Sequence, residues 1–243
     1  MTEIVLVHGA WHGPWCWSQV ADALDQRGHR VHAVTLPGHD QPGRRTRIWS
    51  TIRSAVEAVG DAVAACDSRP LLVGHSMGGY VAQRYLERNH DVSGAVLVAS
   101  VPASGALSAN LRTLRHHPGR TIKAMLTADY MGLVDDPALV RELFFTPETP
   151  DATVLETAAE LQNESALAIN TMVLRRPRPG RVTVPVHVIA AEADAIFTLG
   201  EQRALATAYG ADLVVLPGGH DIMLDTDWAA LVDAVHRVAE PGA

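Results

Sequence analysis

The chain has 243 residues, 47% of them apolar, and a formal net charge of −7. This length and composition allow one domain with a full hydrophobic core, and the acidic balance argues against a nucleic-acid partner. No apolar run approaches the ~18 residues of a membrane span, and the start of the sequence lacks a secretory signal, so we expect a cytoplasmic protein that does not bind a membrane.

Short apolar runs alternate with helix-like segments along most of the chain. The segments that we expect to be strands are 4–7, 31–36, 71–73, 95–99, 185–190 and 213–216. Helical spacing is found at 15–27, 48–66, 79–89, 199–209 and 228–238. Buried strands separated by helices of this length are typical of a mostly parallel sheet flanked by helices, so we predict the α/β class.

The pattern changes between residues 101 and 180, where only helical segments are found, interrupted by prolines. We predict that this stretch is a helical cap inserted into the α/β core. The core then consists of residues 1–100 and 181–243. In such sheets ligands bind beyond the carboxyl ends of the strands, which is the place where an inserted cap covers them.

The segment Gly74-His75-Ser76-Met77-Gly78 follows one expected strand and precedes one expected helix. That is the setting of a nucleophile elbow, a tight turn that presents a serine at the end of a strand. The glycines two residues before and two residues after the serine leave the room that such a turn needs. We therefore predict that Ser76 is a nucleophile and that the Met77 N–H helps to bind an oxyanion.

A serine nucleophile needs a base, and the base needs a carboxylate that fixes its orientation. His220 lies in the loop after the last expected strand, and Asp194 follows the strand before it. The order Ser76, Asp194, His220 along the chain is the order that the nucleophile, acid and base have in enzymes with a nucleophile elbow. Glu192 is two residues from Asp194 and remains an alternative acid. No Asp or Glu occurs in 100–128, which leaves the loop after the strand at 185–190 as the expected source.

The second oxyanion donor is expected in the loop after the first strand, where we choose the Ala10 N–H next to Gly9. Apolar residues beside this loop and in the cap are candidates for a substrate pocket, although each has ordinary core packing as an alternative. They are Trp11, Leu107, Met125, Phe144, Phe145, Met172, Ile196 and Phe197.

Metal-binding patterns are missing from the sequence. There is no HExxH motif and no Cys/His cluster, and the adjacent His116 and His117 would face different directions on a helix. The spacing in Gly74 to Gly79 does not match a nucleotide-binding loop either. We therefore expect neither a metal nor another cofactor.

These motifs resemble those of the α/β-hydrolases, and more narrowly those of the plant methylesterase and hydroxynitrile lyase group with its bacterial esterase relatives. The likeness covers nearly the whole chain; it is carried by Val5 to Ala10, His12 to Trp17, Val73 to Gly79, Phe144 to Pro147 and Pro217 to His220. The resemblance implies a six-stranded sheet with a helical cap, a triad of Ser76, His220 and Asp194, and cofactor-free cleavage of a small or medium apolar ester such as a methyl ester.

Two positions bear on the alternatives within this group. The lyase branch has a threonine where Gly9 stands and a lysine where Asp221 stands, so both positions favour ester hydrolysis over cyanohydrin cleavage. Lyase, thioesterase and lactonase activities on the same triad remain alternatives, as does a non-catalytic receptor for small molecules. The sequence leaves open whether the chain forms a homodimer.

Overall fold

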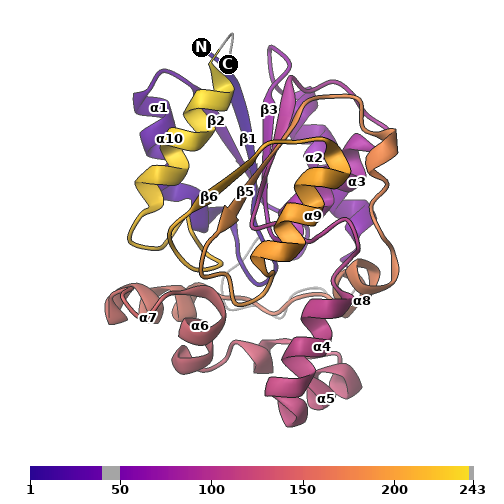
Figure 1. Ribbon diagram of the computed structural model, residues 1–243, viewed down its shortest axis with the longest axis vertical. Coiled ribbons are helices and arrows are strands. Elements are labelled where there is room, and N and C mark those ends of the chain that lie inside the picture. Colours follow the sequence, from indigo (N-terminus) through magenta and orange to yellow (C-terminus); the bar gives the residue numbers. More distant parts are fainter. Residues whose placement is uncertain (40–49, 241–243) are drawn as a thin grey trace.

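The computed structural model describes residues 1–39 and 50–240. Its six strands form one sheet in the order β2-β1-β3-β4-β5-β6, and every neighbouring pair is parallel (Figure 1). The predicted α/β class with a parallel sheet is therefore confirmed. The strands are β1 (Glu3–Val7), β2 (Arg30–Val34), β3 (Leu71–His75), β4 (Gly94–Val98), β5 (Val186–Ala191) and β6 (Leu213–Leu216).

Helices cover both faces of this sheet. On one face lie α1 (Ser18–Gln26) and α10 (Trp228–Ala239), and on the other lie α2 (Ile52–Ala64), α3 (Met77–Leu86) and α9 (Leu199–Tyr209) (Figure 1). Successive side chains of β1 point to opposite faces of the sheet and so belong to two cores. Ile4 and Leu6 pack toward α1 and α10, while Val5 and Val7 pack toward the other helices. Burial on both faces explains why β1 reads as an uninterrupted apolar run.

Most helix boundaries differ from the expected ones by a few residues. The expected helix at 15–27 begins as a separate 3-10 turn, Pro14–Trp17, before α1. The helix expected at 48–66 starts at Ile52, where Thr51 and Ser54 form a reciprocal cap; positions 48 and 49 lie outside the described residues. The helix expected from residue 79 starts at Met77, directly after Ser76, because the elbow leads straight into it.

Residues 101–180, which we call the cap, leave the sheet after β4 and return to it before β5. They contain α4 (Leu107–His116), α5 (Pro118–Thr127), α6 (Pro137–Phe144), α7 (Asp151–Glu160) and α8 (Ala166–Leu174), with short 3-10 turns at Met131–Leu133 and Pro179–Arg181. In Figure 1 α4 to α7 lie beyond one end of the sheet, and α8 contacts α2 of the core. The carboxyl ends of the strands face this assembly.

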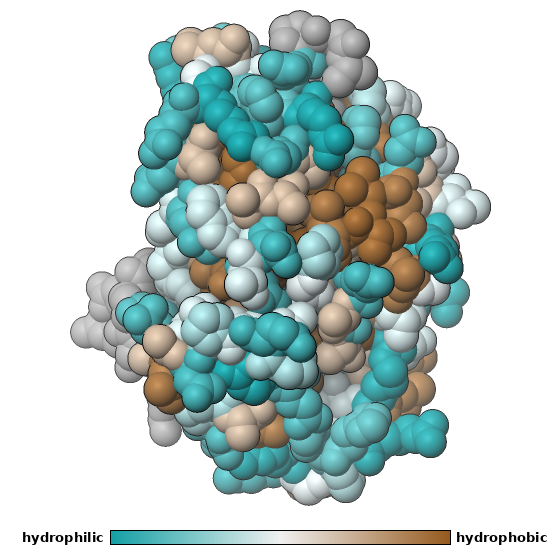
Figure 2. Space-filling view, turned by 60° about the vertical axis from the view of Figure 1, so that its left-hand side comes forward, coloured by the Kyte–Doolittle hydropathy of each residue, from teal (hydrophilic) through white to brown (hydrophobic). Residues whose placement is uncertain are grey.

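The face shown in Figure 2 is mainly polar and carries one apolar patch. Edge strand β6 contributes exposed apolar side chains to the surface, Val214 and Val215 at 37% and 40% exposure. No helix among the described residues is long and apolar enough to cross a membrane. Whether the chain forms a homodimer stays an open prediction.

Candidate active site

The Ser76 turn has the geometry of a strained elbow. Ser76 stands between β3 and α3 with φ 51° and ψ −115°, a left-handed conformation that costs a serine energy. A Cβ at Gly74 would lie 2.5 Å from the Gly78 carbonyl oxygen, and a Cβ at Gly78 would collide with the Val7 and His8 carbonyls. The two glycines are therefore required by close backbone packing around the serine.

The loop after β1 packs against this elbow. A Cβ at Gly9 would lie 2.8 Å from His75 Nδ1 and 3.1 Å from Ser76 Cβ, so only glycine lets the loop approach so closely. Ala10, Ser76 and Met77 line one and the same cavity. Trp11, the next residue, has φ 63°, and its carbonyl accepts a hydrogen bond from the Gln162 N–H of the cap at 2.8 Å. A cap residue thus fixes the loop that carries the expected second oxyanion donor.

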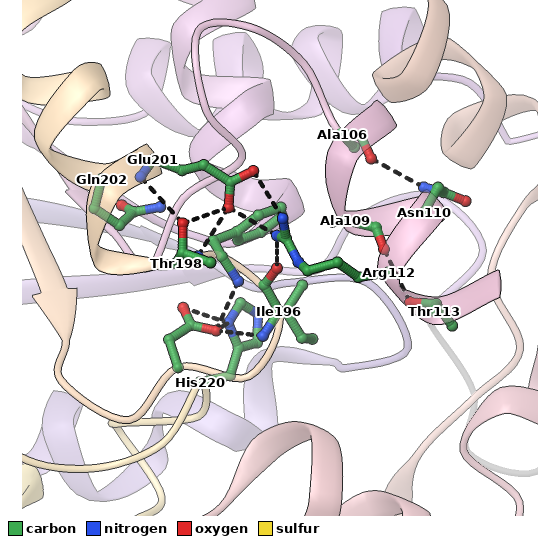
Figure 3. A network of polar contacts seen from close by, with 12 residues as sticks. Ala106, Ala109, Asn110, Arg112, Thr113, Ile196, Thr198, Glu201, Gln202 and His220 are labelled. Atoms are coloured by element: carbon green, nitrogen blue, oxygen red, sulfur yellow. Dashed lines mark hydrogen bonds and ion pairs between the residues drawn. The ribbon is translucent and has the colours of Figure 1, made fainter. Parts of the chain in front are cut away.

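His220 and Asp194 meet although they lie on different loops. His220 Nδ1 is 3.0 Å from both carboxylate oxygens of Asp194, and both side chains are buried. The Asp194 carboxylate also accepts hydrogen bonds from the Ile196 and Phe197 N–H groups at 2.8 and 2.9 Å. Figure 3 shows His220 beside this loop. Glu192, the alternative acid, is exposed.

Two charges act on the His220 imidazole. Burial alone would lower its pKa, but the charge and hydrogen bond of Asp194, with the charge of Asp221, raise the pKa above its ordinary value. In the described part of the chain no hydrogen bond joins the Ser76 hydroxyl to the His220 ring. Catalytic hydrogen bonds often become short only when substrate is bound. Asp194 occupies Nδ1, which leaves Nε2 as the second nitrogen of the ring.

A second buried acid lies behind the histidine. Asp221 Oδ2 is 2.8 Å from His12 Nε2, and His12 Nδ1 donates to the Ala10 carbonyl at 2.7 Å. His75 Nε2 donates to the His220 carbonyl at 3.0 Å and lies 3.7 Å from Asp221 Oδ1. Burial would raise the pKa of Asp221, but the neighbouring histidines, His12 first, lower it. The sequence analysis did not assign His12 a role.

The cavity at Ser76 has a volume of about 80 Å³. Of the expected pocket residues, Trp11, Met172, Ile196 and Phe197 line it. Leu107 and Met125 do not, because their side chains are 48% and 64% exposed on the cap surface.

Phe144 and Phe145 are buried but lie outside the cavity lining, and Phe144 packs on the His220 ring with centroids 6.1 Å apart. We therefore withdraw these two, with Leu107 and Met125, from the pocket. Sequence reasoning missed Ala109 and Thr113 on one face of α4 and Ala106 directly before it, which recur at helical spacing and line the cavity, together with Tyr130 and Leu143.

Among the described residues, two sets of side chains bring potential metal ligands within 4.8 Å of one another: the first is His75, His220 and Asp221, and the second is Glu3, His32 and Cys66. In the first set, His220 already bonds to Asp194, and His75 bonds to the His220 carbonyl. In the second set, near the opposite end of β1, Glu3 accepts two hydrogen bonds from Ser68. Each set therefore contains at least one side chain that already has a hydrogen-bond partner within the protein.

Known proteins share this architecture. The chain is 26% identical over 235 residues to a pyrethroid hydrolase of Sphingobium wenxiniae, which covers 90% of this chain and 81% of that protein. It is 41% identical over 109 residues to the probable esterase PIR7A of rice, but spans only 41% of that protein's length.

Among solved structures, a methylesterase of Arabidopsis (MES16) superimposes with a TM-score of 0.73 at 20% identity, covering 98% of both chains. Polyneuridine aldehyde esterase superimposes with a TM-score of 0.74 at 20% identity, covering 99% of this chain and 100% of that one. The family model of the alpha/beta hydrolases matches residues 4–234. With nearly the whole sequence inside that match, the chain belongs to the alpha/beta hydrolase family.

Proposed function

We propose that the protein is a serine hydrolase that cleaves a small, apolar carboxylic ester through an acyl-enzyme. The observation that carries the proposal is the buried contact between His220 Nδ1 and Asp194, beside a cavity that Ser76 lines. The names of the relatives, which include esterases and hydrolases, support the same reaction class. No cofactor is part of the proposed reaction.

In the proposed reaction His220 Nε2 takes the proton of Ser76 while the serine oxygen attacks the ester carbonyl. The N–H groups of Met77 and Ala10 stabilise the negative oxygen of the tetrahedral intermediate. His220 then gives the proton to the leaving alcohol, and a water molecule activated by the same imidazole releases the acid. Asp194 stabilises the imidazolium and keeps the Nδ1 proton on its side of the ring.

The lining of the cavity favours an uncharged substrate. None of the described lining residues is charged, and two of the polar ones bond to their own helix. Asn110 Nδ2 donates to the Ala106 carbonyl and Thr113 Oγ1 to the Ala109 carbonyl, as Figure 3 shows. A carboxylate or ammonium group bound there would lack a partner of opposite charge, which is costly in an apolar site.

Cyanohydrin cleavage receives less support than ester hydrolysis. The residue after the catalytic histidine would have to reach the substrate, but the Asp221 carboxylate is fully buried against His12 and does not line the cavity. Thioesters and lactones use the same acyl-enzyme chemistry, and they therefore belong in the substrate panel.

A small fluorophosphonate probe tests the proposal directly. We expect it to label the wild-type protein at Ser76 and to leave Ser76→Ala unlabelled. Ser108→Ala, which changes an exposed serine of the cap, is the matched control and should be labelled normally. A wild-type protein that binds small esters but is neither labelled nor active would instead be a receptor.

The acid is tested by hydrolysis of short methyl and acetyl esters, followed as release of acid. Asp194→Asn should lower kcat by roughly 10³–10⁴-fold, because it removes the acceptor that fixes the His220 tautomer. Glu192→Gln should stay close to wild type. The reverse order of effects would make Glu192 the acid.

A further inference from the structure

The catalytic cavity shares a wall with an outer pocket. The cavity at Ser76 measures about 80 Å³ and the outer pocket about 160 Å³. Four residues border both spaces, and we call them the partition: Ala109 and Thr113 of α4, Leu143 of α6, and Ile196 of the loop after β5. The partition is a single layer of residues, because the same four residues line both spaces.

The backbone on the Ile196 side of the partition is held from two directions. The Ile196 N–H donates to Asp194, and its carbonyl accepts from the Arg112 guanidinium. Arg112 is held in turn by both carboxylate oxygens of Glu201, at 3.1 and 2.7 Å (Figure 3). The position of Ile196 is thus fixed by the cap and the core together.

The outer pocket carries charged side chains among its lining residues, which the described lining of the cavity does not. It is lined by Arg112, His116, His117 and Glu142 besides the partition. The His117 ring pairs with Glu142 at 2.9 Å, and Arg112 pairs with Glu201. Because these side chains already have partners, the outer pocket does not require a charged ligand and can accept an uncharged hydrocarbon arm.

The volumes decide what fits beside Ser76. An apolar protein cavity of about 150 Å³ is known to hold one benzene molecule, so a cavity of about 80 Å³ suits a group smaller than that. An ester with a long hydrocarbon arm has to extend past the cavity. The outer pocket lies on the far side of the partition.

We infer that the partition is the specificity-determining element of the site: it limits one arm of the ester to a short apolar group, and the outer pocket becomes a second subsite when the partition is shortened. Leu143 and Ile196 are its two large apolar members and therefore set the limit. This inference rests on the proposed ester hydrolysis.

The test compares kcat/KM over two series of substrates, methyl esters from acetate to octanoate and acetate esters of methanol to octanol. The wild type should lose efficiency with length in at least one series. Leu143→Ala should raise the octyl-to-short ratio in that series by at least about tenfold. Ile196→Ala should shift it in the same direction, and Leu143→Val provides a milder change if the alanine variant folds poorly.

Leu107→Ala is the matched control, because Leu107 is also an apolar residue of the cap but is 48% exposed and outside the partition. Its ratio should equal that of the wild type. Unchanged ratios in both partition variants, or a wild type that already prefers the octyl esters, would overturn the inference while leaving ester hydrolysis intact. A wild type inactive on every ester would remove the proposed function, and the inference with it.

Discussion

His220 stands between two buried carboxylates with different tasks. Asp194 accepts a hydrogen bond from His220 Nδ1. Asp221 instead pairs with His12, and it affects the pKa of the His220 imidazole only through its charge. The His75 ring packs against the His220 ring, with centroids 4.8 Å apart, and it stays neutral because burial lowers its pKa to about 3. Asp194 and Asp221 therefore both act to raise the pKa of the His220 imidazole.

Replacing Asp221 with asparagine should move the acid limb of the pH–rate profile to lower pH. General base catalysis needs the neutral imidazole, so kcat/KM rises as pH passes the pKa of His220, which the two aspartates hold above its ordinary value. Removing the Asp221 charge lowers that pKa, and the neutral form then appears at lower pH. The measurement is kcat/KM on a short ester against pH.

Asp212→Asn, at an exposed aspartate before β6, is the control for a change of net charge and should leave the limb in place. A fall in activity with an unmoved limb would mean that Asp221 acts only on structure.

At the level of elements, the elbow is the place where three strand ends come together. Gly78 packs on the carbonyls that follow β1, and a Cβ at Gly79 would collide with the Ser100 side chain after β4. The turn after β3 is therefore enclosed from both sides. Backbone atoms packed this closely have no free space into which they could shift to accommodate a larger side chain.

Gly78→Ala should destabilise the fold by about 3 kcal/mol, because the added methyl group meets backbone atoms and not flexible side chains. Gly119→Ala in α5 has open space around its Cβ and no positive φ, and it should be neutral or stabilising by up to ~1 kcal/mol. Urea unfolding of both variants checks the contrast. Equal stability of the two would refute the close-packing argument.

The elements that could be predicted are those whose pattern is local. Each of the six expected strands overlaps an observed one, and the helix at 199–209 and the strand at 213–216 have the expected limits. The contact between His12 and Asp221 joins positions 209 residues apart, and nothing in the local pattern signals it. Phe144 was expected in the pocket for a related reason, because apolar character does not tell which side of a cap helix faces the serine.

Over the whole molecule, the cap is tied to three loops that carry candidate site residues, those of Ala10, Asp194 and His220. Arg112 holds the Asp194 loop at Ile196, and Gln162 holds the Ala10 loop at Trp11. The third tie is Thr149, whose hydroxyl donates to Asp225 at 2.5 Å. Asp225 in turn accepts the Gly219 N–H at 2.8 Å, next to His220. The cap thus positions the site as well as covering it.

The hydrogen bond from Thr149 to Asp225 predicts that the contribution of Thr149 to the stability of the fold decreases at low pH. Burial alone would raise the pKa of Asp225, but hydrogen bonds from Thr149, Gly219 and Thr226 lower it below 3.8. A lowered carboxyl pKa adds stability above the unfolded value, and this contribution disappears as the pH falls through the folded value. Thr149→Val removes one donor, so it should cost about 1–2 kcal/mol at neutral pH and less in acid.

Urea unfolding at neutral pH and well below pH 3.8 measures this difference between Thr149→Val and the wild type. Thr127→Val is the control, because its exposed hydroxyl donates to the Lys123 carbonyl and accepts from the Asp129 N–H, and neither partner is a carboxylate side chain. It should show a small change that does not depend on pH. Since the Gly219 N–H shares Asp225 with Thr149, we also expect kcat of Thr149→Val to fall while KM changes little. A stability difference that is the same at both pH values would show that Thr149 contributes packing alone and that the cap does not act on the His220 loop through Asp225.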